Sequence, residues 1–327
     1  MARLDRGPVS GAACDPDMSA IEVRSLSFTY PGADAAVLEG LDWSVPQGAF
    51  ALLVGGTGSG KSTLLSLLKP EIAPAGECTG DARVLGENVA DMDVRASAER
   101  VGYVFQDPEN QIVCETVWHE MAFGLENLGM SRDEMRRRVA ETSYFFGLED
   151  WLHRDTDTLS GGRKQLLSLA AVLALRPRVL LLDEPTSQLD PVAEKNFLHA
   201  LFRVNRELGC TVVVATHQPR PMLEYATYAY RIKGGRVREA VDLASLGSRE
   251  GLLALDSCRP AQGAATSAAA AIREGWFRYD RTSGWVLRGL DVAFSAGVVH
   301  AVVGGNGCGK STMLSVLAKT AKLQRGR

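Results

Sequence analysis

Apolar and polar positions alternate through residues 21–30 and again through residues 41–45, as in strands with one buried face. Residues 166–175 are almost wholly apolar over the length of a buried helix. Three continuous apolar runs have the pattern of parallel strands buried on both faces: residues 50–54, 179–182 and 211–215. The pattern predicts an α/β fold with a mainly parallel core sheet, an antiparallel β portion near the N-terminus and a helical subdomain around residues 106–160.

The pattern of the first segment returns near the end of the chain, 249 positions later and without a gap. Tyr30 corresponds to Tyr279, and the glycine-rich residues 55–63 correspond to residues 304–312. With this spacing Arg327 corresponds to Cys78, just after the helix that follows the glycines. We therefore expect two copies of one module, the second of them truncated.

This repeat divides the chain into four expected segments. Residues 1–18 mix Gly, Pro, Asp and Ala without periodicity and predict a mobile tail. Residues 19–245 would form a complete domain, and residues 272–327 the N-terminal part of a second one. The sequence of residues 246–271, between the two domains, predicts a linker, because the side chains of its second half are small and nearly uncharged. An Ala-rich helix is the alternative for that half.

Composition narrows the class of protein. The chain has 327 residues, of which 46% are hydrophobic and 23% charged, values typical of globular domains. Its net charge of −3 lacks the basic excess of nucleic-acid-binding proteins, so no nucleic acid partner is expected. Six scattered cysteines without a CxxC pair suggest neither a zinc site nor a disulfide framework. No apolar stretch approaches the roughly 20 residues that span a bilayer, so work at a membrane would require partners.

The glycine-rich segment has the spacing of a phosphate-binding loop between a buried strand and a helix. Its backbone N–H groups and the helix N-terminus would bind an anion, Lys61 would add a charge for the β- and γ-phosphates, and the Ser62 hydroxyl would ligate Mg²⁺. A plain glycine turn before a helix is the alternative. The residues expected at this site are Gly55, Gly56, Thr57, Gly58, Ser59, Gly60, Lys61, Ser62 and Thr63.

Two carboxylates follow the buried run at residues 179–182, where parallel sheets place ligands at their carboxyl edge. Asp183 suits the Mg²⁺ shell, partly through water, and Glu184 is placed to polarise a water that attacks the γ-phosphate. A polar strand end is the alternative. Upstream, Ser160-Gly161-Gly162 opens the apolar helix at 166–175 as a second anion-binding N-terminus, or simply as a helix cap.

The glycine loop, the Leu159-Ser160-Gly161-Gly162 signature and the Leu182-Asp183-Glu184-Pro185 strand end, in this order, resemble the motifs of ATP-binding-cassette ATPases. The resemblance covers residues 20 to about 245 completely and 272–327 in part. It implies the P-loop NTPase cassette fold, with ATP and Mg as cofactors.

The resemblance also implies roles at matching positions. Tyr30 would stack on adenine, Gln106 would sense Mg²⁺ and the attacking water, residues 187–190 would cross a dimer interface, and His217 would contact the γ-phosphate; Glu184, His217 and Gln106 form the catalytic set. In the second copy the matching ATP-binding residues are Tyr279, Gly304, Gly305, Asn306, Gly307, Cys308, Gly309, Lys310, Ser311 and Thr312, with Ser311 as the Mg²⁺ ligand. Arg163 stands where the family commonly has glutamine, which leaves the phosphate contacts of Ser160 and Gly162 intact.

Residues 101–113, followed by 115–117 and 122–127, are similar to the ATPases of energy-coupling factor transporters, which import vitamins or metal ions such as cobalt or nickel. In that family the segment after the glutamine lines a groove for a coupling helix. The similarity implies integral membrane partners, a coupling subunit and a substrate-binding subunit, at the cytoplasmic face of the cell membrane. The alternatives are the ATPase of another type of ABC transporter and a soluble tandem cassette that acts on ribosomes or nucleic acid. The short Ala-rich linker and the mildly acidic charge do not favour the soluble cassette.

In this family each ATP lies between the glycine loop of one module and the signature of a second one, in cis or in trans. For the first copy the opposing signature would fall beyond Arg327, and for the second copy the carboxylates would do so. We therefore expect no complete site within one copy of the chain. A second copy that only binds nucleotide and regulates is a further possibility.

Overall fold

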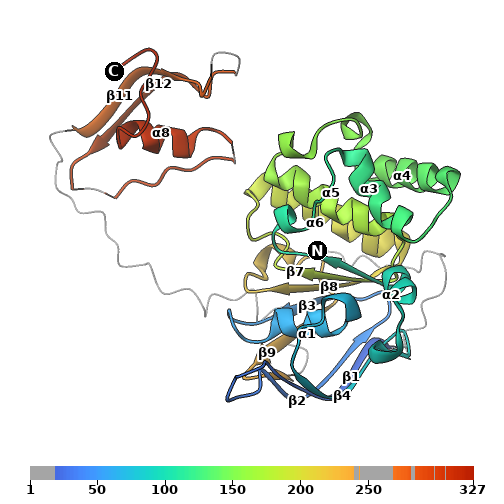
Figure 1. The fold of residues 1–327 in the computed structure, drawn as a ribbon. Helices are drawn as coiled ribbons and strands as arrows, with labels where there is room; N and C mark the ends of the chain where they lie inside the picture. The colour runs from blue at the N-terminus through green and yellow to red at the C-terminus, as the bar shows by residue number, and fades with distance from the viewer. Residues whose placement is uncertain (1–18, 239–242, 244–267, 281–283, 298, 306) are drawn as a thin grey trace, which may run out of the picture. The chain divides into compact units, whose positions relative to one another are not determined.

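The computed structural model describes residues 19–238, 243, 268–280, 284–297, 299–305 and 307–327 (Figure 1). The chain divides into two compact units at residue 248. The expected mobile tail lies outside the described residues, as does the expected linker except for its last four residues.

The first unit is built on a six-stranded sheet in the order β10-β9-β3-β8-β7-β6. All neighbouring pairs are parallel except β9 and β10. The strands are β3 (Phe50–Val54), β6 (Val101–Val104), β7 (Val179–Asp183), β8 (Thr211–Thr216), β9 (Tyr228–Lys233) and β10 (Arg236–Arg238). The expected mainly parallel core sheet is confirmed.

A second, antiparallel sheet in the order β2-β1-β4-β5 covers one side of this core. Its strands are β1 (Ser19–Thr29), β2 (Leu38–Pro46), β4 (Glu77–Val84) and β5 (Glu87–Asn88). Alternate residues of the parallel strands, such as Leu53 and Leu181, pack on this side against Leu64 and Leu65 of α1 (Lys61–Leu67). The short helix α2 (Val94–Arg100) leads into β6.

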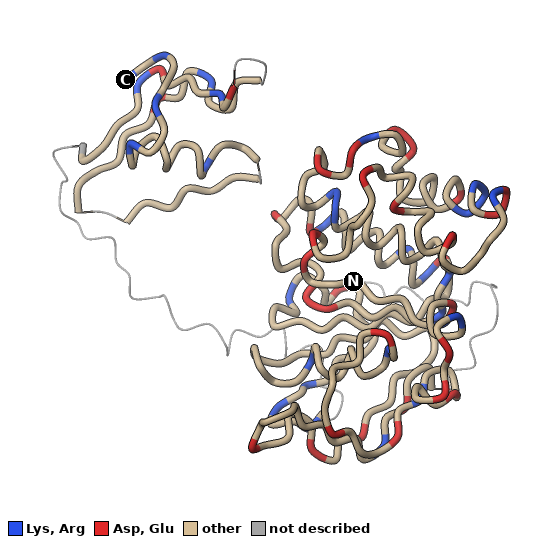
Figure 2. The backbone as a smooth tube through the Cα atoms, in the orientation of Figure 1, with Lys and Arg blue, Asp and Glu red and all other residues tan. Residues whose placement is uncertain are grey.

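The other residues of the same strands face the helices. Leu52 and Leu182 pack against α5 (Gly161–Ala174) and α6 (Pro191–Leu208). Two further helices, α3 (Val117–Asn127) and α4 (Arg132–Phe146), share a separate apolar cluster with α5. Helices α3 and α4 confirm the helical subdomain expected around residues 106–160. All four helices lie on the side of the sheet opposite β1, β2 and β4 (Figure 1). Acidic and basic residues are interspersed over the whole unit (Figure 2).

The second unit contains the hairpin β11 (Ala268–Phe277) and β12 (Leu287–Ser295) and the helix α8 (Lys310–Leu317). These elements lie 249 positions after β1, β2 and α1, to within one residue at each end. Side-chain contacts follow the same spacing: the Asp42 carboxylate accepts the Ser25 backbone N–H in the first unit, and Asp291 accepts that of Glu274 in the second.

Two expectations for the second unit are wrong in detail. Ala268–Ala271 form neither linker nor helix, because they pair with residues 293–295 as the start of β11.

The second expectation concerns the residue that corresponds to Arg327. Gly326, with φ +90°, lies against the Glu274 backbone in the same way as Gly80, with φ +96°, lies against the Ser25 backbone. Since Arg327 exchanges backbone hydrogen bonds with Arg273, it corresponds to Asp81, not Cys78; the turn after α8 is three residues shorter than the one after α1.

Residues 299–303, the counterparts of the central strand β3, form no strand in the second unit. Val299 is 98% exposed and Val303 88% exposed, whereas every residue of β3 is buried between β8 and β9. A central strand needs neighbours on both sides to bond its N–H and C=O groups and to cover its side chains.

Candidate nucleotide site

The loop between β3 and α1 is shaped by its glycines and closed by Lys61. Gly58 and Gly60 have φ angles of +76° and +94°, in the left-handed region where side chains are disfavoured. The Lys61 ammonium donates to the backbone carbonyls of Gly55 at 2.8 Å and Gly56 at 3.0 Å, and the residue is only 5% exposed. The ammonium therefore lies under the loop, within reach of an anion that binds there.

Glu184 connects Lys61 to His217 at the carboxyl edge of β7 and β8. One of its oxygens lies 3.5 Å from the Lys61 Nζ, and the other lies 2.8 Å from His217 Nδ1 and accepts the His217 backbone N–H at 3.3 Å. Its φ of +45° is rare for a residue with a side chain and costs about 1 kcal/mol or more. The strained backbone and the two partners hold the carboxylate beside the loop.

The Oδ1 atom of Asp183 is buried and has no hydrogen-bond partner among the described residues. Burial raises the pKa of this carboxyl and Glu184 raises it further, whereas a hydrogen bond from Ser62 and the charge of Lys61 lower it. The described residues contain no cluster of three His, Cys, Asp or Glu side chains for a metal. A carboxylate and a hydroxyl do fit Mg²⁺, which is usually held by one or two carboxylates together with substrate phosphates.

The remaining residues expected in the first site lie on separate elements. Tyr30, 38% exposed at the end of β1, shares a 3.0 Å hydrogen bond with Thr63 on α1. Gln106 follows β6 and donates to the Ser187 hydroxyl at 3.4 Å. Ser160 and Gly161 begin α5, where Gly162 packs so closely on α6 that a Cβ would lie 2.7 Å from that of Ala193. The structure thus joins Lys61, Asp183, Glu184 and His217, and places the signature at the start of a different helix.

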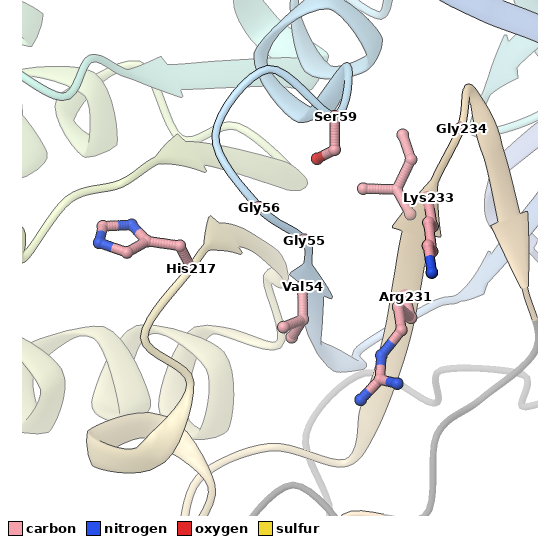
Figure 3. Close-up of a pocket in the computed structure, with 9 residues that line it drawn as sticks. Val54, Gly55, Gly56, Ser59, His217, Arg231, Lys233 and Gly234 are labelled. Carbon is pink, nitrogen blue, oxygen red and sulfur yellow. The ribbon is translucent and has the colours of Figure 1, made fainter. Parts of the chain in front are cut away.

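A cavity of about 480 Å³ lies beside the glycine loop. Figure 3 shows His217 on one side of Gly55 and the basic side chains of Arg231 and Lys233, from β9, on the other. Sequence reasoning missed these two cations. Strand β9 pairs with β3 although residues 55–227 separate them in the chain, and no local pattern indicates that neighbour.

The second loop repeats this geometry in its own unit. Lys310 donates to the Gly304 and Gly305 carbonyls, each at 2.8 Å, and Tyr279 shares a 2.9 Å hydrogen bond with Thr312. A cavity of about 290 Å³ is lined by Tyr279, Val286, Gly307, Gly309, Lys310, Ser311 and Thr312. Cys308 is exposed, and Asn306 lies outside the described residues.

Comparison with known proteins identifies relatives of both loop regions. The family model described as "ABC transporter" matches residues 38–187 and 287–327. A candidate ABC transporter ATP-binding protein of Bacillus cereus is 39% identical over 94% of this chain and 62% of its own length, and one of Streptomyces avermitilis is 42% identical over 63% of this chain and 37% of its own length. The chain thus spans less than two thirds of the length of these relatives.

Solved structures agree with the fold. CbiO1 of Clostridium perfringens, part of the ABC transporter complex CbiONQ, covers 70% of this chain with a TM-score of 0.63 and 30% identity, and 90% of that chain is matched. The cassette MJ0796, solved as a dimer with ADP and Pi, covers 68% with a TM-score of 0.60 and 26% identity, and 98% of that chain is matched. Among the described residues no helix is long and apolar enough to cross a membrane. The family match covers more than half of the residues of this chain, and the first matched segment contains the glycine loop, the signature and the two carboxylates. The chain therefore belongs to the ABC transporter family and carries its ATPase domain.

Proposed function

We propose that this chain is the ATP-binding and ATP-hydrolysing component of an importer. The observation that carries the ATPase part of the proposal is the contact of Glu184 with Lys61 and His217 beside the glycine loop. Next to it, Asp183 Oδ1 is buried without a hydrogen-bond partner among the described residues. Such an arrangement offers a cation for phosphate, a carboxylate for water and an oxygen ligand for a divalent ion.

In the proposed mechanism the glycine loop binds the phosphates of ATP, and Lys61 exchanges its two backbone carbonyls for β- and γ-phosphate oxygens. This exchange moves positive charge away from Glu184, whose carboxylate then accepts a proton from the attacking water. His217 contacts the γ-phosphate, and Tyr30 stacks on the adenine. Ser62, Asp183 and Gln106, partly through water, would hold Mg²⁺, which supplies charge neutralisation at the phosphates.

We further propose that residues 19–245 act as a cassette module and that residues 272–327 belong to a second one. The matching spacing of β11, β12 and α8, and of the Tyr279 to Thr312 hydrogen bond, supports this division. The second loop, from Gly304 to Thr312 with Ser311 toward Mg²⁺, would bind a nucleotide of its own. Ser160, Gly161 and Gly162 would complete such a site across a module interface, in cis or in trans.

The transporter class that we propose is the energy-coupling factor type, with integral coupling and substrate-binding subunits at the cytoplasmic face of the membrane. The structural neighbour CbiO1 belongs to a CbiONQ complex, which supports this class. Exposed apolar side chains follow Gln106: Val113 is 66% exposed and Phe123 is 45% exposed. A membrane subunit that docks there would cover apolar surface now in water.

The experiment that tests this function is purification of the protein from membranes of its native host, followed by identification of what elutes with it. We expect an integral membrane protein to elute in stoichiometric amount, together with ATPase activity. Elution without a membrane protein, or with ribosomes, would contradict the import proposal and leave the ATPase chemistry to be judged by the substitutions below.

Thiol labelling offers a direct prediction for the second loop. If Cys308 lies against bound phosphates, saturating MgATP will slow its alkylation by about tenfold or more, because the thiol reacts only while the site is empty. Cys78 is also exposed but lies on β4, and serves as the internal control. Mass spectrometry of both peptides gives the two rates. Equal slowing of both cysteines, or of neither, would count against nucleotide binding at the second loop.

A further inference from the structure

Lys164, the fourth residue of α5, carries a buried charge for which the mechanism above has no use. The residue is 8% exposed, and its ammonium donates to Glu109 Oε1 at 2.6 Å. The Glu109 side chain is itself 65% exposed, so the buried partner of this pair is the ammonium. Burial of an ammonium is costly unless it is paired, so this contact governs where the side chain lies. Glu109 belongs to the short helical turn Pro108–Asn110, which comes directly after Gln106 and Asp107.

A second contact joins the same two segments. The neighbouring Gln165, 1% exposed, donates from its side-chain amide to the Phe105 carbonyl at 3.3 Å. The Phe105 N–H in turn donates to the Gln111 side chain at 2.9 Å, which closes residues 105–111 into a compact loop. The first turns of α5 therefore hold this loop at two points, Phe105 at its start and Glu109 in its second half.

The two segments joined in this way serve different proposed nucleotide sites. Gln106 acts on the ATP bound by its own module, whereas the signature Ser160–Gly162 acts on the ATP of the opposing one. We propose that Lys164 is a positioning residue that makes the Gln106 loop and the signature move as one body. The proposal rests on the proposed ATPase function.

The opposite end of α5 provides a matched control. Arg176, just beyond the helix, pairs with Glu141 of α4 at 2.5 Å, and both side chains are about half exposed. This pair also joins α5 to another segment, but it lies at the far end of the helix from Ser160. Because exposed pairs contribute little, its loss should leave the signature in place.

Hydrogen exchange of the full chain tests the coupling without any need for turnover. We expect Lys164→Met to speed exchange by about fivefold or more in peptides from residues 105–111 and from the start of α5 together, with the end of α5 unchanged. Lys164→Arg should restore the parental rates, and Arg176→Gln should leave both peptides unaffected. Faster exchange in only one of the two segments, in neither, or along the whole helix would overturn the proposal.

Steady-state kinetics supplies the second readout. Lys164→Met should lower kcat by about fivefold or more and change KM for ATP by less than about twofold, since the glycine loop and Lys61 are untouched. Arg176→Gln should change neither constant. A rise in KM at constant kcat would overturn the positioning role. A parent protein that hydrolyses no ATP would refute the proposed function instead, and the exchange experiment would still decide whether the two segments are coupled.

Discussion

Glu184→Gln is expected to reduce steady-state ATP hydrolysis by about 100-fold or more and to leave ATP binding nearly unchanged. A positioned general base typically contributes 10²- to 10⁴-fold, and the amide keeps the size of the side chain but cannot accept the proton of the attacking water. The substitution also removes the anion that Lys61 and His217 contact at 3.5 and 2.8 Å, but it leaves Lys61, which would bind the phosphates, in place. Phosphate release at saturating MgATP and calorimetric titration with ATP measure the two effects separately.

A glutamate outside the site controls for the loss of charge. Glu207, at the end of α6, pairs with Arg203 on the surface, and Glu207→Gln should change turnover by less than about twofold. Residual turnover above one tenth of the parental rate in Glu184→Gln would assign the role of base to another group. Loss of ATP affinity together with turnover would mean that Glu184 serves binding rather than proton transfer.

Lys61→Ala is expected to weaken ATP binding to the first loop by about 30-fold or more. Truncation of one partner of a buried, hydrogen-bonded charge pair between two binding partners costs about 2 kcal/mol or more. Lys61 is almost fully buried beneath the loop and would form such a pair with the phosphates. The Glu184 carboxylate would lose its neighbouring cation and repel the incoming phosphates. Titration with a fluorescent ATP analogue measures the affinity.

The second unit supplies the comparison for this variant. Lys310 makes the same two backbone hydrogen bonds, and Lys310→Ala should affect only the nucleotide bound at the second loop. Protection of Cys308 from alkylation reports that loop, so Lys61→Ala should preserve the protection and Lys310→Ala should remove it. Loss of protection in both variants would indicate one shared site or a general defect in folding.

The place of the candidate site residues in the fold was predictable where one motif carries its own chemistry. The glycine spacing before Lys61 and the two acids that end a buried strand identify their elements without any knowledge of neighbours, and the carboxyl edges of β3, β7 and β8 do meet. The fold class followed from the length of the apolar runs, because strands buried on both faces contain few polar residues.

Features that depend on distant pairing were not predictable. Ala268–Ala271 carry little intrinsic preference for a strand and adopt one because residues 293–295 lie beside them. No local pattern links Glu109 to Lys164, and only the packing of α5 against the Gln106 loop buries the ammonium. The shorter turn after α8 could not be detected in the sequence, because an alignment of the two copies without a gap fits equally well as far as the end of the helix.

The position of β3 in the sheet has a consequence for synthesis on the ribosome. Both of its neighbours, β8 and β9, come after residue 210, so the strand that carries the nucleotide loop emerges long before either can pair with it. At 5 to 20 residues per second the wait is roughly 8 to 30 s, during which five apolar residues remain uncovered. This interval is when the nascent chain presents its main opportunity for chaperone binding or aggregation.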